Sequence, residues 1–146
     1  MTIARRRRSN ARVPPLNAAQ WEFLSCVAAR IVPAVASFDE PATARFRAIV
    51  GKAIADRPAS VRRQLALFLG VIRWLPAVRW ARRFDRLAPE HRDAFLRFLM
   101  RAPLAKVRNG FWGLRALVFM GVYARPEAWP EIGYAPSFKG NERLHA

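Results

Sequence analysis

LAKVRNGFWGLRALVFMGVY, residues 104–123, is the stretch that decides the fold class, because apolar side chains recur in it at the three- and four-residue spacing of an α-helix. These side chains form two stripes on different sides of the helix. The first stripe contains Leu104, Val107, Phe111, Leu114 and Val118, and the second contains Trp112, Ala116, Phe119, Met120 and Tyr123. A helix that is apolar on most sides is typically buried on most sides, so one interpretation places it at the centre of a helical bundle. The other interpretation leaves one stripe exposed for a partner.

Upstream of this stretch, prolines and capping residues mark the starts of further helices. Asn17 with a glutamine three residues later is a capping box, which predicts a helix that runs to about Val32. A second helix is expected from Asp39, a third from Pro58 and another from Pro89. The third is expected to turn five apolar side chains inward: Val61, Leu65, Phe68, Leu69 and Ile72. No segment alternates between apolar and polar residues as a strand would.

We therefore predict an all-α fold, a single helical bundle of about five to seven helices. The expected organisation is a flexible basic arm at residues 1–15, a helical domain at residues 16–138 and a loose C-terminal tail at residues 139–146. A chain of 146 residues of which 53% are hydrophobic can bury a core without the help of disulfides or metals.

The chain is strongly basic. Its 26 lysines and arginines against 10 acidic residues give a formal net charge of +16. Most of this excess lies in the N-terminal arm and in residues 57–115, and nearly all of the basic residues are arginines. Arginine suits contacts with carboxylates, phosphates and aromatic rings, so the bias is compatible with a binding surface. A GC-rich genome produces the same bias without any selection for binding.

Residues that could carry catalysis or hold a cofactor are few. Cys26 is the single cysteine, and the two histidines, His91 and His145, complete no metal-ligand set with it. The seven glycines do not have the spacing of a dinucleotide- or phosphate-binding loop. Glu90 and Asp93 stand in a basic neighbourhood that suits ion pairs rather than general acid catalysis. We therefore expect no catalytic residue, no metal and no cofactor in this chain.

The sequence shows neither a complete export signal nor a membrane span. The arginines at residues 5–8 invite a twin-arginine interpretation, but no uninterrupted apolar segment follows them. The longest strongly apolar run, from Ala116 to Tyr123, is far shorter than the roughly 20 residues that cross a bilayer. We expect a soluble protein that stays in the cytoplasm unless it is exported together with a partner.

The segment from Leu114 to Tyr134 resembles the end of the gluconate 2-dehydrogenase subunit 3 family. The matching pattern is an apolar helix that ends in Tyr123, followed by Pro126-Glu127, Trp129 and Ile132-Gly133-Tyr134. Members of the family are small helical subunits of FAD-dependent dehydrogenases of the glucose–methanol–choline type. The resemblance implies a noncatalytic accessory subunit that binds, stabilises and helps to mature the large FAD-containing subunit of an alcohol or sugar dehydrogenase. FAD and the catalytic histidine would then belong to that large subunit.

Tryptophans alternate with arginines in the basic middle of the chain, and both residue types are enriched at binding hot spots. The expected partner-binding residues are Arg73, Trp74, Arg79, Trp80, Phe111, Trp112, Tyr123, Trp129, Ile132, Gly133 and Tyr134. In the simplest structural alternative, Ile132 and Tyr134 fold back onto the long helix, so that the tail docks on its own core.

Two other functional classes stay open. One is a basic nucleic-acid-binding helical module, suggested by the net charge of +16. It is the less favoured alternative, because the tryptophans lie in apolar stripes and no pair of helices contains a polar recognition helix. The other is a small enzyme or ligand-binding bundle, which would need convergent carboxylates or histidines that the sequence does not display.

Overall fold

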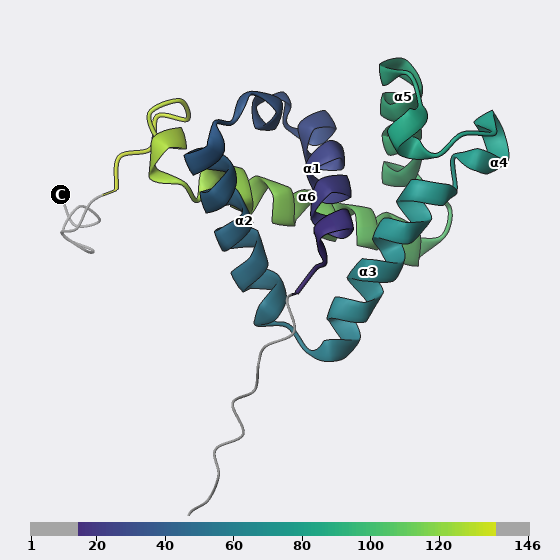
Figure 1. Cartoon of the computed structure of the whole chain (residues 1–146), viewed down its shortest axis with the longest axis horizontal. Coiled ribbons are helices and arrows are strands. Elements are labelled where there is room, and N and C mark those ends of the chain that lie inside the picture. Colours follow the sequence, from purple (N-terminus) through teal and green to yellow (C-terminus); the bar gives the residue numbers. More distant parts are fainter. Residues whose placement is uncertain (1–14, 137–146) are drawn as a thin grey trace, which may run out of the picture.

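The computed structural model describes residues 15–136, and every regular element in this range is a helix (Figure 1). The elements are α1 (Ala18–Ile31), η1 (Pro33–Ser37), α2 (Glu40–Ala55), α3 (Ala59–Trp74), α4 (Ala77–Trp80), η2 (Phe84–Arg86), α5 (Pro89–Met100), α6 (Ala105–Tyr123) and η3 (Pro126–Ala128), where η marks a 3₁₀ turn. The all-α prediction is confirmed. The tail predicted at 139–146 and nearly all of the arm predicted at 1–15 lie outside the described residues.

The helices begin where the capping residues predict. The Asn17 side chain accepts a hydrogen bond from the Gln20 backbone N–H at 2.8 Å, and the Gln20 side chain accepts one from the Asn17 N–H at 2.9 Å. Asp39 caps α2 in the same way, accepting from the Ala42 N–H at 2.8 Å. Each cap satisfies backbone donors that a helix start leaves without intrahelical partners.

The helices are arranged around α6. In Figure 1, α2 and α3 form the two arms of a V, α1 lies between the arms, and α6 crosses behind all three. Contacts of α6 with α1, α2, α3, α5 and η3 make it the element that all the other long helices share. The largest fully buried side chains come from several of these helices and from η2: Phe46, Phe84, Leu24, Ile72, Leu99 and Leu114.

A glycine allows α2 to approach α6 closely. A Cβ atom built on Gly121 would lie 2.6 Å from the Val50 Cγ2 atom and 2.7 Å from the Phe46 Cε2 atom. Such distances are too short for carbon atoms, so a larger residue at this position would force the two helices apart.

The two stripes of α6 have different environments. Phe111, Leu114 and Val118, from the first stripe, are buried in the core, whereas Trp112, Met120 and Tyr123, from the second, are exposed. The structure therefore combines the two interpretations: α6 is central to the bundle and still presents one apolar stripe on the surface. The first stripe begins later than expected, because Leu104 is exposed just before the helix.

Helix α3 also departs from its predicted face at one end. Leu69 and Ile72 are buried as expected, and Leu65 and Phe68 pack against the core. Val61 is exposed, because the first turn of α3 lies at the point of the V, away from the other helices (Figure 1). Between residues 15 and 136, no helix combines the length and the apolar character that crossing a bilayer requires.

Candidate functional site

The exposed stripe of α6 continues into the segment that follows it. We call Trp112, Met120, Tyr123, Trp129, Ile132 and Tyr134 the α6 surface; Trp129 is half-buried and the other five side chains are exposed. The Trp129 indole N–H donates to the Tyr123 carbonyl at 3.2 Å, and the Trp129 and Tyr134 rings meet edge to face at 5.5 Å between centroids. The end of α6 and the following segment thus form one aromatic group.

The beginning of this segment is anchored to the bundle. Arg125 is buried, its guanidinium lies 3.9 Å from the centroid of the Phe38 ring, and its Nε donates to the Val122 carbonyl at 3.1 Å. Glu127 forms an ion pair with Arg45 of α2. These contacts hold η3 against the rest of the protein.

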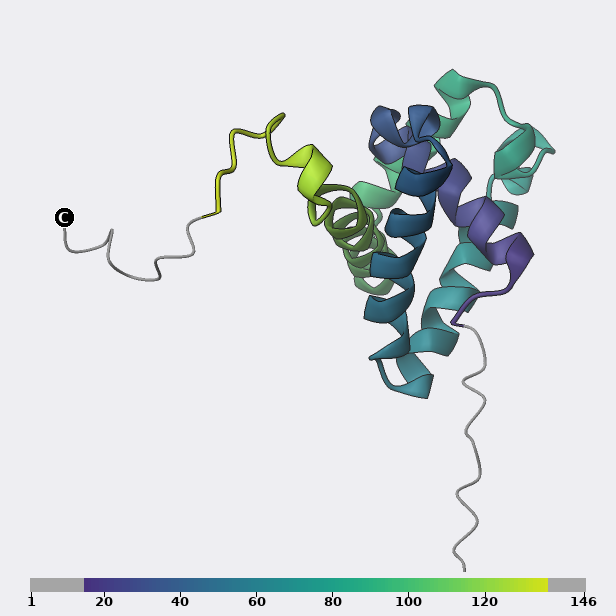
Figure 2. The ribbon, with the colours of Figure 1, turned by 60° about the vertical axis from the view of Figure 1, so that its left-hand side comes forward.

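Beyond η3 the chain leaves the bundle, as Figure 2 shows. Gly133 has a φ of +66°, a left-handed conformation that glycine adopts without strain. Tyr134 is 54% exposed and Ile132 is exposed to a similar extent. The expectation that these two side chains fold back onto the long helix is therefore wrong: Tyr134 packs on Trp129, and Ile132 stays exposed.

A second exposed apolar group lies on α3 and α4, and the sequence analysis identified only its tryptophan. We call it the α3 surface; its members are Leu67, Val71, Trp74, Leu75 and Val78. Leu67, Trp74 and Val78 are 71%, 57% and 87% exposed. The spacing of three and four residues that joins Leu67, Val71 and Trp74 places these three along one side of α3, and Val78 lies in α4, the short helix that follows. This spacing is the signal that could have revealed the surface from the sequence.

Arginines lie over aromatic rings of both surfaces. The Arg115 guanidinium lies 5.1 Å from the Trp112 ring centroid and 5.0 Å from that of Phe119. The Arg83 guanidinium lies 5.3 Å from the Trp74 ring centroid. Each arrangement places a positive charge over the negative face of a ring. Arg83 already donates to the Asp85 carboxylate at 3.1 Å, whereas Arg115 has no carboxylate partner among residues 15–136.

Three of the predicted partner-binding residues are buried or half-buried and contact other residues of the bundle. Phe111 is only 2% exposed and lies in the core, which corrects its assignment to the interaction surface. Arg73 lies over the Phe23 ring and 3.9 Å from Asp85, beneath the η2 turn. Trp80 is half-buried, and its ring stacks on the His91 ring with 5.3 Å between the ring centroids. Arg79, by contrast, is exposed beside Trp80.

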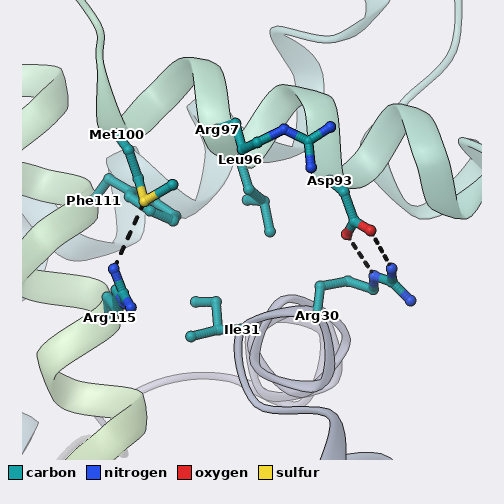
Figure 3. A pocket seen from close by; sticks show the side chains of 8 residues that line it. All are labelled: Arg30, Ile31, Asp93, Leu96, Arg97, Met100, Phe111 and Arg115. Atoms are coloured by element: carbon teal, nitrogen blue, oxygen red, sulfur yellow. Dashed lines mark hydrogen bonds and ion pairs between the residues drawn. The ribbon is translucent and has the colours of Figure 1, made fainter.

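A small hollow opens between α1, α5 and α6, with a volume of about 220 Å³ (Figure 3). It is lined by Arg30, Ile31, Asp93, Leu96, Arg97, Met100, Phe111 and Arg115. Arg30 and Asp93 form one wall through two hydrogen bonds of 2.9 and 2.5 Å. These bonds from Arg30 hold the pKa of the Asp93 carboxyl below its usual value. The residues that line this hollow come from three separated helices, so no local sequence pattern predicts it.

The single cysteine of the chain, Cys26, is half-buried. Burial raises the pKa of the Cys26 thiol, with the nearby Arg92 acting in the opposite direction. Within the part of the chain that the structure describes, no three His, Cys, Asp or Glu side chains lie close enough to hold a metal ion.

No protein-family model matches the chain, and no curated protein or solved structure is significantly similar to it.

Proposed function

We propose that this chain is a noncatalytic accessory subunit that binds, stabilises and helps to mature the FAD-containing catalytic subunit of an alcohol or sugar dehydrogenase. The observation that carries the proposal is the α6 surface. Exposed large apolar side chains that lie next to one another are typical of interaction sites, and tryptophan, tyrosine and arginine are the residue types that contribute most to binding.

The chemical character of the partner surface follows from the arginines. Arg115 adds positive charge above the exposed Trp112 ring, and the whole chain carries a net charge of +16. A matching surface would offer an apolar patch bordered by carboxylates, which guanidinium groups bind with two parallel hydrogen bonds.

The identity of the partner rests on the resemblance of residues 114–134 to the gluconate 2-dehydrogenase subunit 3 family. This stretch coincides with the second half of α6 and the segment that leaves the bundle. Tyr123, Trp129 and Tyr134, which belong to the pattern, form the aromatic group at this end. Docking on a large subunit gives these exposed side chains a physical use. FAD and its chemistry belong to the partner in this proposal.

The test is to look for a flavoprotein dehydrogenase encoded in a neighbouring reading frame and to co-express it with the tagged chain. The expected result is a yellow complex whose flavin absorbance elutes with the tag. The double variant Trp112→Ala/Tyr134→Ala should lose most of the bound flavoprotein. Val61→Ala, which removes an exposed apolar side chain from the first turn of α3, serves as the control and should retain it. Recovery of an equal amount of flavoprotein with both variants would refute the assignment of the interface.

The second candidate function is nucleic-acid binding, favoured by the net charge of +16. Its signature would be a linear fall of log affinity with log salt concentration, measured by fluorescence anisotropy with a labelled DNA duplex and a labelled RNA hairpin. The accessory-subunit proposal predicts that Trp112→Ala/Tyr134→Ala leaves any such binding unchanged, because phosphate contacts do not need the exposed rings.

A further inference from the structure

The hollow between α1, α5 and α6 has an excess of positive charge that no other wall residue neutralises. Three arginines line it, Arg30, Arg97 and Arg115, against the single carboxylate of Asp93. Asp93 is already engaged by Arg30 through two hydrogen bonds. The charge of Arg97 also acts on Asp93 and lowers the pKa of its carboxyl. Figure 3 shows Arg97 and Asp93 at one end of the hollow and Arg115 at the opposite end. The charge of Arg115 is therefore the one left over.

The contacts that hold Arg115 in place leave its guanidinium able to bind an anion. Its ring contacts with Trp112 and Phe119 fix the guanidinium, while its one hydrogen-bond acceptor among residues 15–136 is the Met100 sulfur at 3.7 Å. A thioether is a weak acceptor, so a carboxylate would replace it readily. Arg97 makes no hydrogen bond or ion pair with any other described residue, and it lies one helical turn from Asp93.

The rest of the lining is apolar. Ile31, Leu96 and Phe111 line the space between the charged groups, and Phe111 belongs to the buried core. The volume of about 220 Å³ is smaller than the roughly 300–1,000 Å³ of pockets for drug-sized ligands. An occupant must therefore be small, with an apolar body and a negatively charged end.

We propose that this hollow binds a carboxylate carried on a short apolar group. Two sources share this chemistry: a free short-chain carboxylic acid, and the C-terminal residue of a polypeptide that ends in an apolar side chain. In both, the carboxylate lies against Arg115 and the apolar group extends over Ile31, Leu96 and Phe111. This site is distinct from the α6 surface, although Arg115 contributes to both.

The first arm of the test uses hexanoate, followed by NMR chemical shifts of the backbone amides of α5 and α6. Saturable shifts are expected around the hollow. Hexanol, which has the same apolar body without the charge, and inorganic phosphate, which has charge without the body, should each bind about tenfold more weakly than hexanoate. Equal binding of hexanol and hexanoate, or no saturable shifts with hexanoate, would overturn the proposal.

The second arm uses matched variants. Arg97→Gln/Arg115→Gln should weaken hexanoate binding by about tenfold or more, because it removes the guanidinium that binds the carboxylate, Arg115, and a second positive charge from the rim of the hollow. Arg47→Gln/Arg63→Gln changes the net charge by the same amount at two exposed positions on α2 and α3 and should leave binding unchanged. Equal weakening by both pairs would show that the overall charge of the protein, and not this hollow, binds the acid.

A third arm separates the two sources. A short N-acetylated peptide ending in leucine is compared with the same peptide carrying a C-terminal amide. Shifts in the same amides with the free-acid peptide alone assign the hollow to polypeptide C-termini as well as to small acids. Binding of hexanoate without binding of either peptide restricts it to free acids. Equal binding of the amide and the free acid in the hollow would contradict the role given to the arginines.

Discussion

The close approach of α2 to α6 at Gly121 gives a quantitative prediction. In Gly121→Ala, the new Cβ atom would lie 2.6 Å from Val50 Cγ2 and 2.7 Å from Phe46 Cε2, both on fully buried side chains. Both side chains belong to the packed core, so the overpacking should cost about 1–3 kcal/mol. Alanine also has a higher helix propensity than glycine, by roughly 1 kcal/mol, which offsets part of this cost.

Gly113→Ala on the same helix isolates the packing effect. A Cβ atom at Gly113 meets nothing within 4 Å, so this variant receives the propensity gain alone and should be more stable than the parent by up to about 1 kcal/mol. Because both variants share the propensity gain, the difference between them measures the overpacking, about 1–3 kcal/mol in favour of Gly113→Ala.

Urea denaturation followed by circular dichroism measures both free energies of unfolding, provided that the slopes agree. The double variant Gly121→Ala/Val50→Ala adds a check, because removing the Val50 methyl groups relieves part of the clash. Its loss of stability should therefore be smaller than the sum of the two single losses. If Gly121→Ala were as stable as Gly113→Ala, the packing of α2 on α6 described here would be refuted.

Three further predictions concern single side chains. Phe111→Ala should lower the free energy of unfolding by about 3–5 kcal/mol, whereas its exposed neighbour Trp112→Ala should cost less than about 1 kcal/mol; similar losses in urea denaturation would contradict the placement of the two rings. Iodoacetamide should label Cys26 more slowly in the folded protein than in the urea-unfolded chain at neutral pH, because burial raises its pKa and the thiolate is the reactive form; equal rates would count against this. The lowered pKa of Asp93 contributes stability that is present above the usual aspartate pKa and lost as the pH falls through the lowered value. Asp93→Asn should therefore be less stable than the parent near neutral pH, by about 0.2–1 kcal/mol because the ion pair is partly exposed. The difference in free energy of unfolding between variant and parent should disappear in acid. A difference that does not change with pH would disprove the ion-pair contribution.

The helix boundaries could be predicted because their causes are local. The capping box at Asn17 and the cap at Asp39 involve residues within one turn, and prolines stop or start helices through their own geometry. No knowledge of the rest of the fold is needed to recognise them. The all-α fold class follows from these boundaries together with the helical spacing of apolar residues.

The orientation of the helices was harder to predict. Helix α3 has apolar side chains on two sides, and its predicted inward face is correct at Leu69 and wrong at Val61. The spacing alone does not show how far along the helix its neighbours reach. The same ambiguity on α6 assigned buried Phe111 to the surface with Trp112. Which side faces the core depends on where the other helices cross. Gly121, which accommodates Phe46, marks such a crossing, but Gly113 has open space, so glycines alone would not have identified the face.

The hollow between α1, α5 and α6 could not be predicted from the sequence for a related reason. Asp93 and Arg97 are one turn apart on α5, whereas Arg30 and Arg115 approach them from α1 and α6. Their separation in the sequence hides the cluster, and each of them alone resembles an ordinary surface charge. A ligand-binding bundle is expected to bring carboxylates or histidines together, whereas this fold brings three arginines together in the hollow.

The positive charge favours a negatively charged partner, whereas the exposed apolar side chains favour a partner with an apolar surface. These two preferences distinguish the two candidate functions. A polyphosphate backbone could neutralise the arginines but would leave Leu67, Val78 and Ile132 in water, because phosphates and sugars offer little apolar surface to cover them. A protein surface with an apolar patch bordered by carboxylates can cover exposed apolar side chains and also pair with Arg115 above the Trp112 ring. Only the second kind of partner uses both features at once, and for this reason the accessory-subunit proposal is the stronger of the two.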